Sequence, residues 1–289
     1  MRGAIDNNEL FLVYQPKVDL QHGHIIGAEA LLRWISPELG FISPADFIPI
    51  AEASGEILRI GDWVIDQAIN QLEYWFAEQQ LPKDFKVAVN VAALQLSQSD
   101  FAGKLIAQLK ASTVPLSAIE VEVTESGLMQ NVDLAISQLN RLAEQGVSIA
   151  IDDFGTGYSS LAYLKNMPVS VLKIDRAFIK DMDADSQDRR LAETVINMAR
   201  NLGCDTVAEG VECLEHIELL KEMGCTIVQG YWYSPPLKPD AFITFAEGHH
   251  KQLQAETPPL GSYQLSVKEK YGAAGALGHC EVRSNPFNR

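Results

Sequence analysis

The chain of 289 residues has a formal net charge of −15, and 47% of its residues are hydrophobic. Such an acidic chain does not suit nonspecific nucleic-acid binding, which relies on Lys and Arg to displace counterions from phosphates. No apolar run approaches the ~20 residues that span a bilayer, and the first ten residues lack the apolar stretch of an export signal. We therefore expect a cytoplasmic protein with no membrane insertion of this chain.

Short apolar runs predict eight strands along the chain. Their ranges are 10–16, 25–34, 86–92, 118–125, 147–153, 169–175, 205–212 and 226–233. Amphipathic stretches with apolar residues at helical spacing lie between most of them, as at 60–80, 134–146 and 189–203. This alternation predicts an α/β fold with a mostly parallel sheet, and eight units in this length favour a closed barrel over a doubly wound open sheet.

The connection between the first two predicted strands breaks this pattern. Its sequence, DLQHGHI, is much shorter than the dozen or more residues that a parallel crossover needs. The first two strands should therefore form an antiparallel hairpin, which makes the start of the barrel irregular. We expect His22 and His24, in the turn, to be solvated rather than to bind a ligand.

Polar residues lie within or at the ends of seven of the predicted strands. They are Glu29, Asn90, Glu122, the pair Asp152 and Asp153, Lys173, Glu209 and Gln229. Each has an ordinary explanation when taken alone, such as a turn residue or a solvated strand end. Because the carboxyl ends of barrel strands meet at one mouth, we expect the whole set to gather there. Several carboxylates buried together need a cation to offset repulsion and desolvation.

The residue types indicate which cation. Carboxylate and amide oxygens favour Mg²⁺ or Mn²⁺, whereas zinc would prefer His or Cys. The adjacent Asp152 and Asp153 can reach separate ions, which suggests a two-ion centre that activates water for attack on phosphorus. The sequence therefore predicts phosphodiester hydrolysis. Asp153-Phe154-Gly155 also has the letters of a kinase magnesium motif, but no HRDxxxxN segment precedes it, and no GxxxxGK[ST] loop is present.

A resemblance to a known family rests on an ordered set of motifs. Glu29-Ala30-Leu31, with Arg33 and Trp34 after it, resembles the signature of the EAL-domain family of cyclic di-GMP phosphodiesterases. The other blocks follow in order: YQP (14–16), NV with QL (90–96), EVTES (122–126), DDFGTGYSSL (152–161), LKID (172–175), AEGVE (208–212) and QGYW (229–232). The resemblance runs from about Glu9 to Phe245, and the ordered set is far more specific than the tripeptide alone.

The resemblance implies a modified TIM (β/α)8 barrel with an antiparallel first strand, and cleavage of cyclic di-GMP to linear pGpG with Mg²⁺ or Mn²⁺. It implies a first ion held by Glu29, Asn90, Glu122 and Asp152. Asp152 would bridge to a second ion near Asp153 and Glu209. The departure at Ala92, where many relatives have Ser, removes a hydroxyl but keeps the Asn90 amide.

The resemblance also implies the roles of the remaining site residues. Lys173 would contact the attacking water, and Glu209 is the favoured general base or water-holding ligand. Arg33 would clamp a phosphate, Gln15 and Asp175 would help to position the dinucleotide, and Gln229 would support the metal and water shell. Glu125 would anchor the loop after Asp153, which leads to a helix near Ser159 and connects the ions to a homodimer interface.

The expected organisation is an EAL domain over residues 1–260, followed by a tail over residues 261–289 that is disordered, left over from cloning or partner-binding. The chain is expected to be either a standalone enzyme or part of a longer protein with a sensory or cyclase domain. Two alternatives remain open: a catalytically silent receptor for cyclic di-GMP, and a two-ion phosphodiesterase for another nucleotide.

Overall fold

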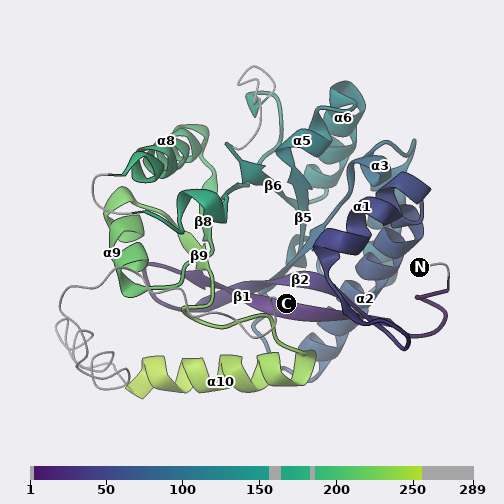
Figure 1. Ribbon diagram of the computed structural model, residues 1–289, viewed down its shortest axis with the longest axis horizontal. Helices are drawn as coiled ribbons and strands as arrows, with labels where there is room; N and C mark the ends of the chain where they lie inside the picture. The colour runs from purple at the N-terminus through teal and green to yellow at the C-terminus, as the bar shows by residue number, and fades with distance from the viewer. Residues whose placement is uncertain (1–2, 156–163, 183–185, 256–289) are drawn as a thin grey trace.

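The computed structural model describes residues 3–155, 164–182 and 186–255 (Figure 1). Nine strands in these ranges form one sheet. They are β1 Leu10–Asp19, β2 Ile25–Ser36, β3 Gly40–Ile42, β4 Lys86–Asn90, β5 Ile119–Thr124, β6 Ser148–Phe154, β7 Val171–Ile174, β8 Asp205–Glu209 and β9 Ile227–Gln229. Their order is β1-β9-β8-β7-β6-β5-β4-β2-β3, and β1 also pairs with β2. Eight strands therefore close into a barrel, and the predicted fold is confirmed.

The first strand runs against both of its neighbours. β1 pairs antiparallel with β2 through a register that includes Gln15 opposite Glu29, and antiparallel with β9 through Val18 opposite Val228. The other neighbours in the ring, from β2 through β4 to β9, pair in parallel. The predicted hairpin is confirmed. The His22 and His24 side chains are exposed at its tip, as expected.

Helices surround the ring (Figure 1). They are α1 Pro44–Ser54, α2 Ile57–Ala77, α3 Ala93–Leu96, α4 Phe101–Ala111, α5 Glu125–Leu128, α6 Val132–Ala143, α8 Gln187–Leu202, α9 Leu214–Met223 and α10 Pro239–Ala255. The predicted helical ranges correspond to α2, α6 and α8. The residues at the two ends of α8 explain where this helix begins and ends. The Ser186 hydroxyl accepts a hydrogen bond from the Arg189 amide at its start, and Gly203 adopts a left-handed conformation at its end.

Successive side chains along each strand point alternately towards the helices outside the ring and towards the barrel interior. On β5, Ile119, Val121 and Val123 face the helices, while Glu120 and Glu122 lie on the opposite face. On β1, Tyr14 packs on the outer side against Trp75 of α2, with ring centroids 4.8 Å apart. Trp75 in turn stacks on Phe242 of α10. Figure 1 shows α10 lying along β1, so the N- and C-terminal elements share one hydrophobic core.

The predicted boundaries differ from the structure at several strand ends. The short β3 was not predicted, because three residues are too few to show a period; it pairs with the end of β2 around a turn in which Gly40 is left-handed. β8 stops before the left-handed Gly210, and β9 stops before Gly230. The predicted helix start at Ser159 and the predicted tail over residues 261–289 lie outside the described residues. None of the described helices has the length and apolar character needed to cross a membrane.

Candidate active site

The polar residues predicted to meet do so at the carboxyl ends of the parallel strands. The parallel register places Asn90 of β4 beside Glu122 of β5, and Glu209 of β8 beside Gln229 of β9. On the antiparallel β1, Gln15 lies near the middle of the strand, opposite Glu29 of β2. One mouth of the barrel therefore collects side chains that are far apart in the sequence.

Three buried acids form the centre of the site. Glu29, Glu122 and Asp152 each present a carboxylate oxygen, and these oxygens all lie within 4.8 Å of one another. The Asn90 amide donates to Glu29 Oε1 at 2.7 Å, which leaves its own carbonyl oxygen available to a ligand. The predicted first-ion set is thus brought together in space.

Lys173 lies among these acids. Its Nζ atom is 2.7 Å from Glu122 Oε2, 3.0 Å from Asp152 Oδ2 and 2.7 Å from Glu209 Oε1. It also lies 3.7 Å from Glu29 Oε2. Burial alone would lower the pKa of this ammonium, but the surrounding carboxylates outweigh burial and raise the pKa well above its ordinary value. Lys173 is therefore a permanently charged partner of the site acids.

The buried site acids differ in pKa because their charged neighbours differ. Burial would raise the pKa of Glu122, yet the ammonium groups of Lys17 and Lys173 lower it to about 2. Glu209 has a pKa of about 8, raised first by burial and then by the charges of Asp152 and Glu29. The pKa of Glu29 is raised for the same two kinds of reason, burial and neighbouring carboxylates. This excess of buried negative charge favours the binding of cations.

Asp153 lies outside the trio and has an unusual backbone. Its φ is +55°, in the left-handed region, and its amide donates to Asp152 Oδ1 at 2.9 Å. Burial raises the pKa of its carboxyl to about 6, helped by Asp152 and by a hydrogen bond with Asp175. Strand alternation points the side chains of consecutive residues to opposite faces. The left-handed backbone of Asp153 also separates the directions of the two acids. Asp153 thus lies with Asp175 rather than with the trio.

Gln229 connects the trio to β1. Its Nε2 atom donates to Glu29 Oε2 at 2.6 Å and to Gln15 Oε1 at 3.1 Å, while Gln15 Nε2 donates to the Ser234 carbonyl at 3.2 Å. Gln229 Oε1 is buried and has no hydrogen-bond partner among the described residues. An acceptor in that position calls for a donor such as a water or a ligand N–H group.

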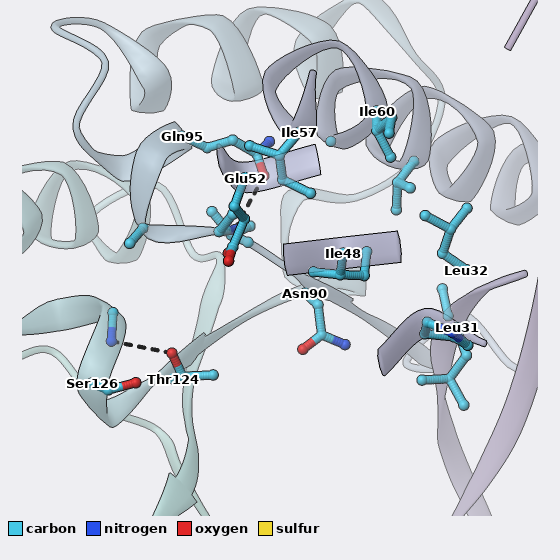
Figure 2. A pocket seen from close by; sticks show the side chains of 18 of the residues that line it. Leu31, Leu32, Ile48, Glu52, Ile57, Ile60, Asn90, Gln95, Thr124 and Ser126 are labelled. Atoms are coloured by element: carbon cyan, nitrogen blue, oxygen red, sulfur yellow. Dashed lines mark hydrogen bonds between the residues drawn. The ribbon is translucent and has the colours of Figure 1, made fainter. Parts of the chain in front are cut away.

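A cavity of about 510 Å³ lies between the end of β2, α1 and α2, and Asn90, which donates to Glu29, is on its wall (Figure 2). Leu31, Ile48 and Ile57 form part of its apolar wall, and Asn90 and Arg33 lie on its polar side. Within the described part of the chain, the Arg33 guanidinium makes one hydrogen bond, from Nη1 to the neighbouring Leu32 carbonyl at 2.9 Å. Burial lowers the pKa of Arg33, so an anion in the cavity would relieve the cost of burying its charge.

Glu125 lies at the start of α5 and contacts the segment after Asp153. Its Oε2 atom accepts a hydrogen bond from the Gly155 amide at 3.0 Å, and its Oε1 atom is buried without a partner among the described residues. Residues 156–163 come directly after Gly155 and lie outside the described residues. Glu125 therefore fixes Gly155 directly after the end of β6.

Sequence reasoning missed a second buried pair, Lys17 and Glu120. Lys17 Nζ lies 2.6 Å from both Glu120 Oε1 and Glu122 Oε1. The first predicted strand ends at Pro16, one residue before Lys17. A usable signal did exist, because Glu120 and Glu122 are two residues apart on one strand and must share a face. Two inward carboxylates require a cation between them.

The donor chemistry of the site fits Mg²⁺ or Mn²⁺. The ligand atoms on offer are carboxylate oxygens and an amide oxygen, with neither His nor Cys among the trio. Glu29, Asn90, Glu122 and Asp152 would hold one ion. Glu209 borders this set through its contact with Lys173, whereas Asp153 lies beside Asp175.

Comparison with known proteins identifies the family that this chain resembles. The family model described as the EAL domain matches residues 1–236. The chain is 40% identical over 243 residues to MucR of Pseudomonas aeruginosa, named a bifunctional diguanylate cyclase/cyclic di-GMP phosphodiesterase, covering 84% of this chain and 35% of MucR. It is 40% identical over 264 residues to cyclic di-GMP phosphodiesterase NbdA of the same organism, covering 91% of this chain and 33% of NbdA. The chain spans about a third of the length of these relatives.

Solved structures agree in fold. A structure of the PaMucR phosphodiesterase in complex with c-di-GMP matches with a TM-score of 0.79 and 41% identity, covering 83% of this chain and 97% of that one. The EAL domain of FimX from Pseudomonas aeruginosa, bound to c-di-GMP, matches with a TM-score of 0.72, covering 82% of this chain and 94% of that one. At 24% identity this second match supports the fold alone.

Proposed function

Because the chain belongs to the EAL domain family, we propose that it is a phosphodiesterase that hydrolyses cyclic di-GMP to linear pGpG with two divalent cations, Mg²⁺ or Mn²⁺. The observation that carries this proposal is the buried trio of Glu29, Glu122 and Asp152, which Asn90 connects to a cavity of about 510 Å³. The names of the MucR and NbdA relatives, and the c-di-GMP complex of PaMucR, support the choice of substrate.

In this proposal the first ion is held by Glu29, Asn90, Glu122 and Asp152. Asp152 would also contribute to a second ion, together with Asp153 and Glu209. When bound, the ions supply electrostatic stabilisation of the charge on phosphate and lower the pKa of the attacking water. The excess of buried carboxylates over lysines in the site supports this assignment, because uncompensated buried charge favours a bound cation.

Two side chains handle the water and its proton. Lys173, which contacts Asp152 and Glu209, would contact the attacking water. Glu209, in its ionised form, would take the proton that the water loses. In the ion-free protein, burial and the neighbouring carboxylates raise the pKa of Glu209 to about 8, so bound cations would be needed to hold this carboxylate ionised near neutral pH.

The remaining residues bind and orient the dinucleotide. Arg33 would clamp a phosphate, and the apolar wall that includes Ile48 suits the flat face of a base (Figure 2). Gln229 would offer its unpartnered Oε1 to the substrate or a water, with Gln15 holding it in place. Asp175, next to Asp153, would help to orient the nucleotide.

The loop after Gly155, anchored by Glu125, would connect the site to a homodimer interface. Since the chain spans about a third of its relatives' length, a sensory or cyclase domain in a longer parent protein would act through this connection. The dimer and the extra domains belong to the proposal and rest on family resemblance.

A direct assay tests the proposal. The purified chain is incubated with cyclic di-GMP and either Mg²⁺ or Mn²⁺, and the products are separated by chromatography. We expect linear pGpG, lost on chelation with EDTA and lost in Glu29→Ala, because that carboxylate belongs to the buried trio. Glu144→Ala, an exposed acid at the end of α6, is the matched control and should keep full activity.

Recovery of intact cyclic di-GMP with both ions would overturn the hydrolase assignment. If calorimetry then showed that the chain still binds the nucleotide, the receptor alternative would take its place. Cleavage of a different nucleotide, with cyclic di-GMP left uncut, would instead favour a two-ion phosphodiesterase of another specificity.

A further inference from the structure

A group of histidines lies at the end of the barrel opposite the site acids. The β1–β2 hairpin turns at the amino ends of the parallel strands, away from the mouth where their carboxyl ends meet. The chain has six histidines, and four of them meet at this turn: His22 and His24 from the hairpin, and His249 and His250 from α10. Because His is the commonest metal ligand in proteins, this corner is a candidate metal site.

His249 holds α10 against the hairpin. Its Nε2–H group donates to the Gly23 carbonyl at 2.7 Å, and its ring stacks on Phe245 of the same helix with centroids 5.9 Å apart. The sequence favours solvent exposure for His22 and His24, and both are exposed. What local pattern cannot show is that α10 brings further imidazoles to the same turn.

The His24 ring is the neighbour of two other exposed imidazoles. Its centroid lies 6.4 Å from that of His22 and 6.3 Å from that of His250. Since a Zn–N bond is about 2.0–2.1 Å, two imidazoles that share an ion have nitrogens within about 4 Å of each other. The His22 and His24 rings are nearly parallel, so they must turn to point nitrogens at a common ion. Exposed side chains make such rotamer changes within nanoseconds.

The hydrogen bonds of these rings leave nitrogens available. Asp19 Oδ1 lies 3.2 Å from His22 Nδ1, and an ionised carboxylate only accepts, so Nδ1 carries the proton and Nε2 keeps its lone pair. A carboxylate on the far nitrogen is the arrangement that orients metal-binding histidines. His250 Nε2 lies 2.7 Å from the Gln254 amide. When the amide oxygen accepts from Nε2–H, the lone pair of His250 is on Nδ1.

The ligand atoms at this end differ from those at the mouth. Imidazole nitrogens suit Zn²⁺, Ni²⁺ and Cu²⁺, whereas the carboxylate oxygens of the mouth suit Mg²⁺ or Mn²⁺. Zn²⁺ takes four ligands, so three imidazoles would leave one position for water. The formal net charge of −15 favours the approach of any cation.

We propose that His22, His24 and His250 bind a divalent transition cation, with Zn²⁺ as its representative, and that the ion joins the β1–β2 hairpin to α10. Asp19 is then a positioning residue that acts through His22. The site is separate from the acids at the mouth and does not depend on hydrolysis of a nucleotide.

The test measures Zn²⁺ binding by calorimetry with excess Mg²⁺ present to occupy the acids. Any Zn²⁺ that displaces Mg²⁺ there does so equally in every variant. One variant, His22→Gln with His24→Gln, removes the hairpin nitrogens, and His250→Gln removes the nitrogen from α10. Gln252→Asn, an exposed neighbour on α10, is the matched control. The melting temperature with and without Zn²⁺ is a second readout.

Removing a group that orients a metal ligand costs about 10- to 100-fold in affinity, and removing a ligand costs at least as much. We therefore expect Zn²⁺ binding to weaken about tenfold in Asp19→Asn, and on the order of 100-fold or more in the paired hairpin variant and in His250→Gln. Zn²⁺ should raise the melting temperature of the wild type more than that of His250→Gln, because only the wild type joins the two elements.

Two outcomes would overturn the proposal at the level of the site. One is wild-type affinity for Zn²⁺ in the paired hairpin variant, and the other is an equal loss in Gln252→Asn, which would mean nonspecific binding. Wild-type affinity in His250→Gln would overturn the connection between the hairpin and α10.

Discussion

At the scale of single residues, the site depends on a few side chains in unusual states. Asp153 adopts φ of +55° with its amide bonded to the Asp152 carboxylate, and Lys173 lies among four acids. A non-glycine residue in the left-handed region is uncommon, and Asp and Asn tolerate it best. The chain thus uses a residue type that combines tolerance of this backbone with a carboxylate, which favours a chemical role for Asp153.

Asp153→Asn should separate turnover from binding. Asn keeps the left-handed backbone but loses the charge that the proposed second cation would need, so turnover should fall roughly 100-fold. Binding of cyclic di-GMP, measured by calorimetry under conditions without turnover, should change little. Asp62→Asn, an exposed acid on α2, is the control. Wild-type turnover and metal dependence in Asp153→Asn would remove Asp153 from the site.

Arg33→Ala should act mainly on affinity. A charge-assisted contact with phosphate is worth about 1.5–3 kcal/mol, so the dissociation constant of the nucleotide should rise about 10- to 150-fold. Calorimetry measures this directly, with Arg59→Ala as a control because Arg59 is an exposed arginine on α2. An unchanged dissociation constant would show that Arg33 does not grip the substrate.

At the scale of elements, most of the fold could be predicted from the sequence. The strands of the ring are apolar runs with both faces buried, and the larger helices have clear apolar stripes, so both gave strong periodic signals. β3 has only three residues and no period to detect. Glu120 had a local signal in its two-residue spacing from Glu122, but the partner could not be found in this way. Lys17 meets Glu120 because β1 and β5 face each other across the barrel, and local pattern carries no information about that distance.

Gly230 illustrates how one position sets the end of a strand. A Cβ atom there would lie 2.1 Å from the Val211 carbonyl oxygen, a backbone atom that cannot move away alone. Gly230→Ala should therefore destabilise the protein by about 1–3 kcal/mol, as overpacking does elsewhere. The change would also displace the neighbouring Gln229 side chain, so turnover of the nucleotide should fall.

Chemical denaturation measures the first effect of Gly230→Ala. Gly248→Ala is the matched control: Gly248 is exposed on α10 and an added Cβ meets nothing within 4 Å. Because Ala favours helix over Gly by about 1 kcal/mol, this control should stabilise the protein. Equal stability of the two variants would mean that β9 and the segment at Val211 are not in close contact.

At the scale of the whole molecule, the barrel interior buries more carboxylates than lysines. Glu209 and Asp153 have raised pKa values, about 8 and about 6, mainly because burial disfavours their charged forms. A raised carboxyl pKa stabilises the folded state most below the unfolded pKa, near 4, and this contribution disappears as pH rises through the folded value. The ion-free protein should therefore lose stability from these groups between about pH 4 and pH 8.

Added Mg²⁺ should offset that loss. Cations compete with protons for the same carboxylates, so the rise in melting temperature caused by Mg²⁺ should grow from pH 5.5 to pH 8.5. Thermal unfolding with Mg²⁺ or with EDTA across this range measures the effect. Calorimetry in two buffers of different ionisation enthalpy should also detect proton release on binding near pH 7. A melting shift that stays constant with pH would contradict the assigned protonation of Glu209.

Closure of the ring by β1 has a consequence for synthesis of the chain. Gln15 leaves the ribosome early, whereas its partner Gln229 lies 214 positions later. The first strand must therefore wait without one of its two neighbours until nearly the whole ring has been translated. A nascent polypeptide cannot assemble a complete cation site before that point, so premature termination anywhere upstream of β9 would yield fragments with an open ring and no working centre.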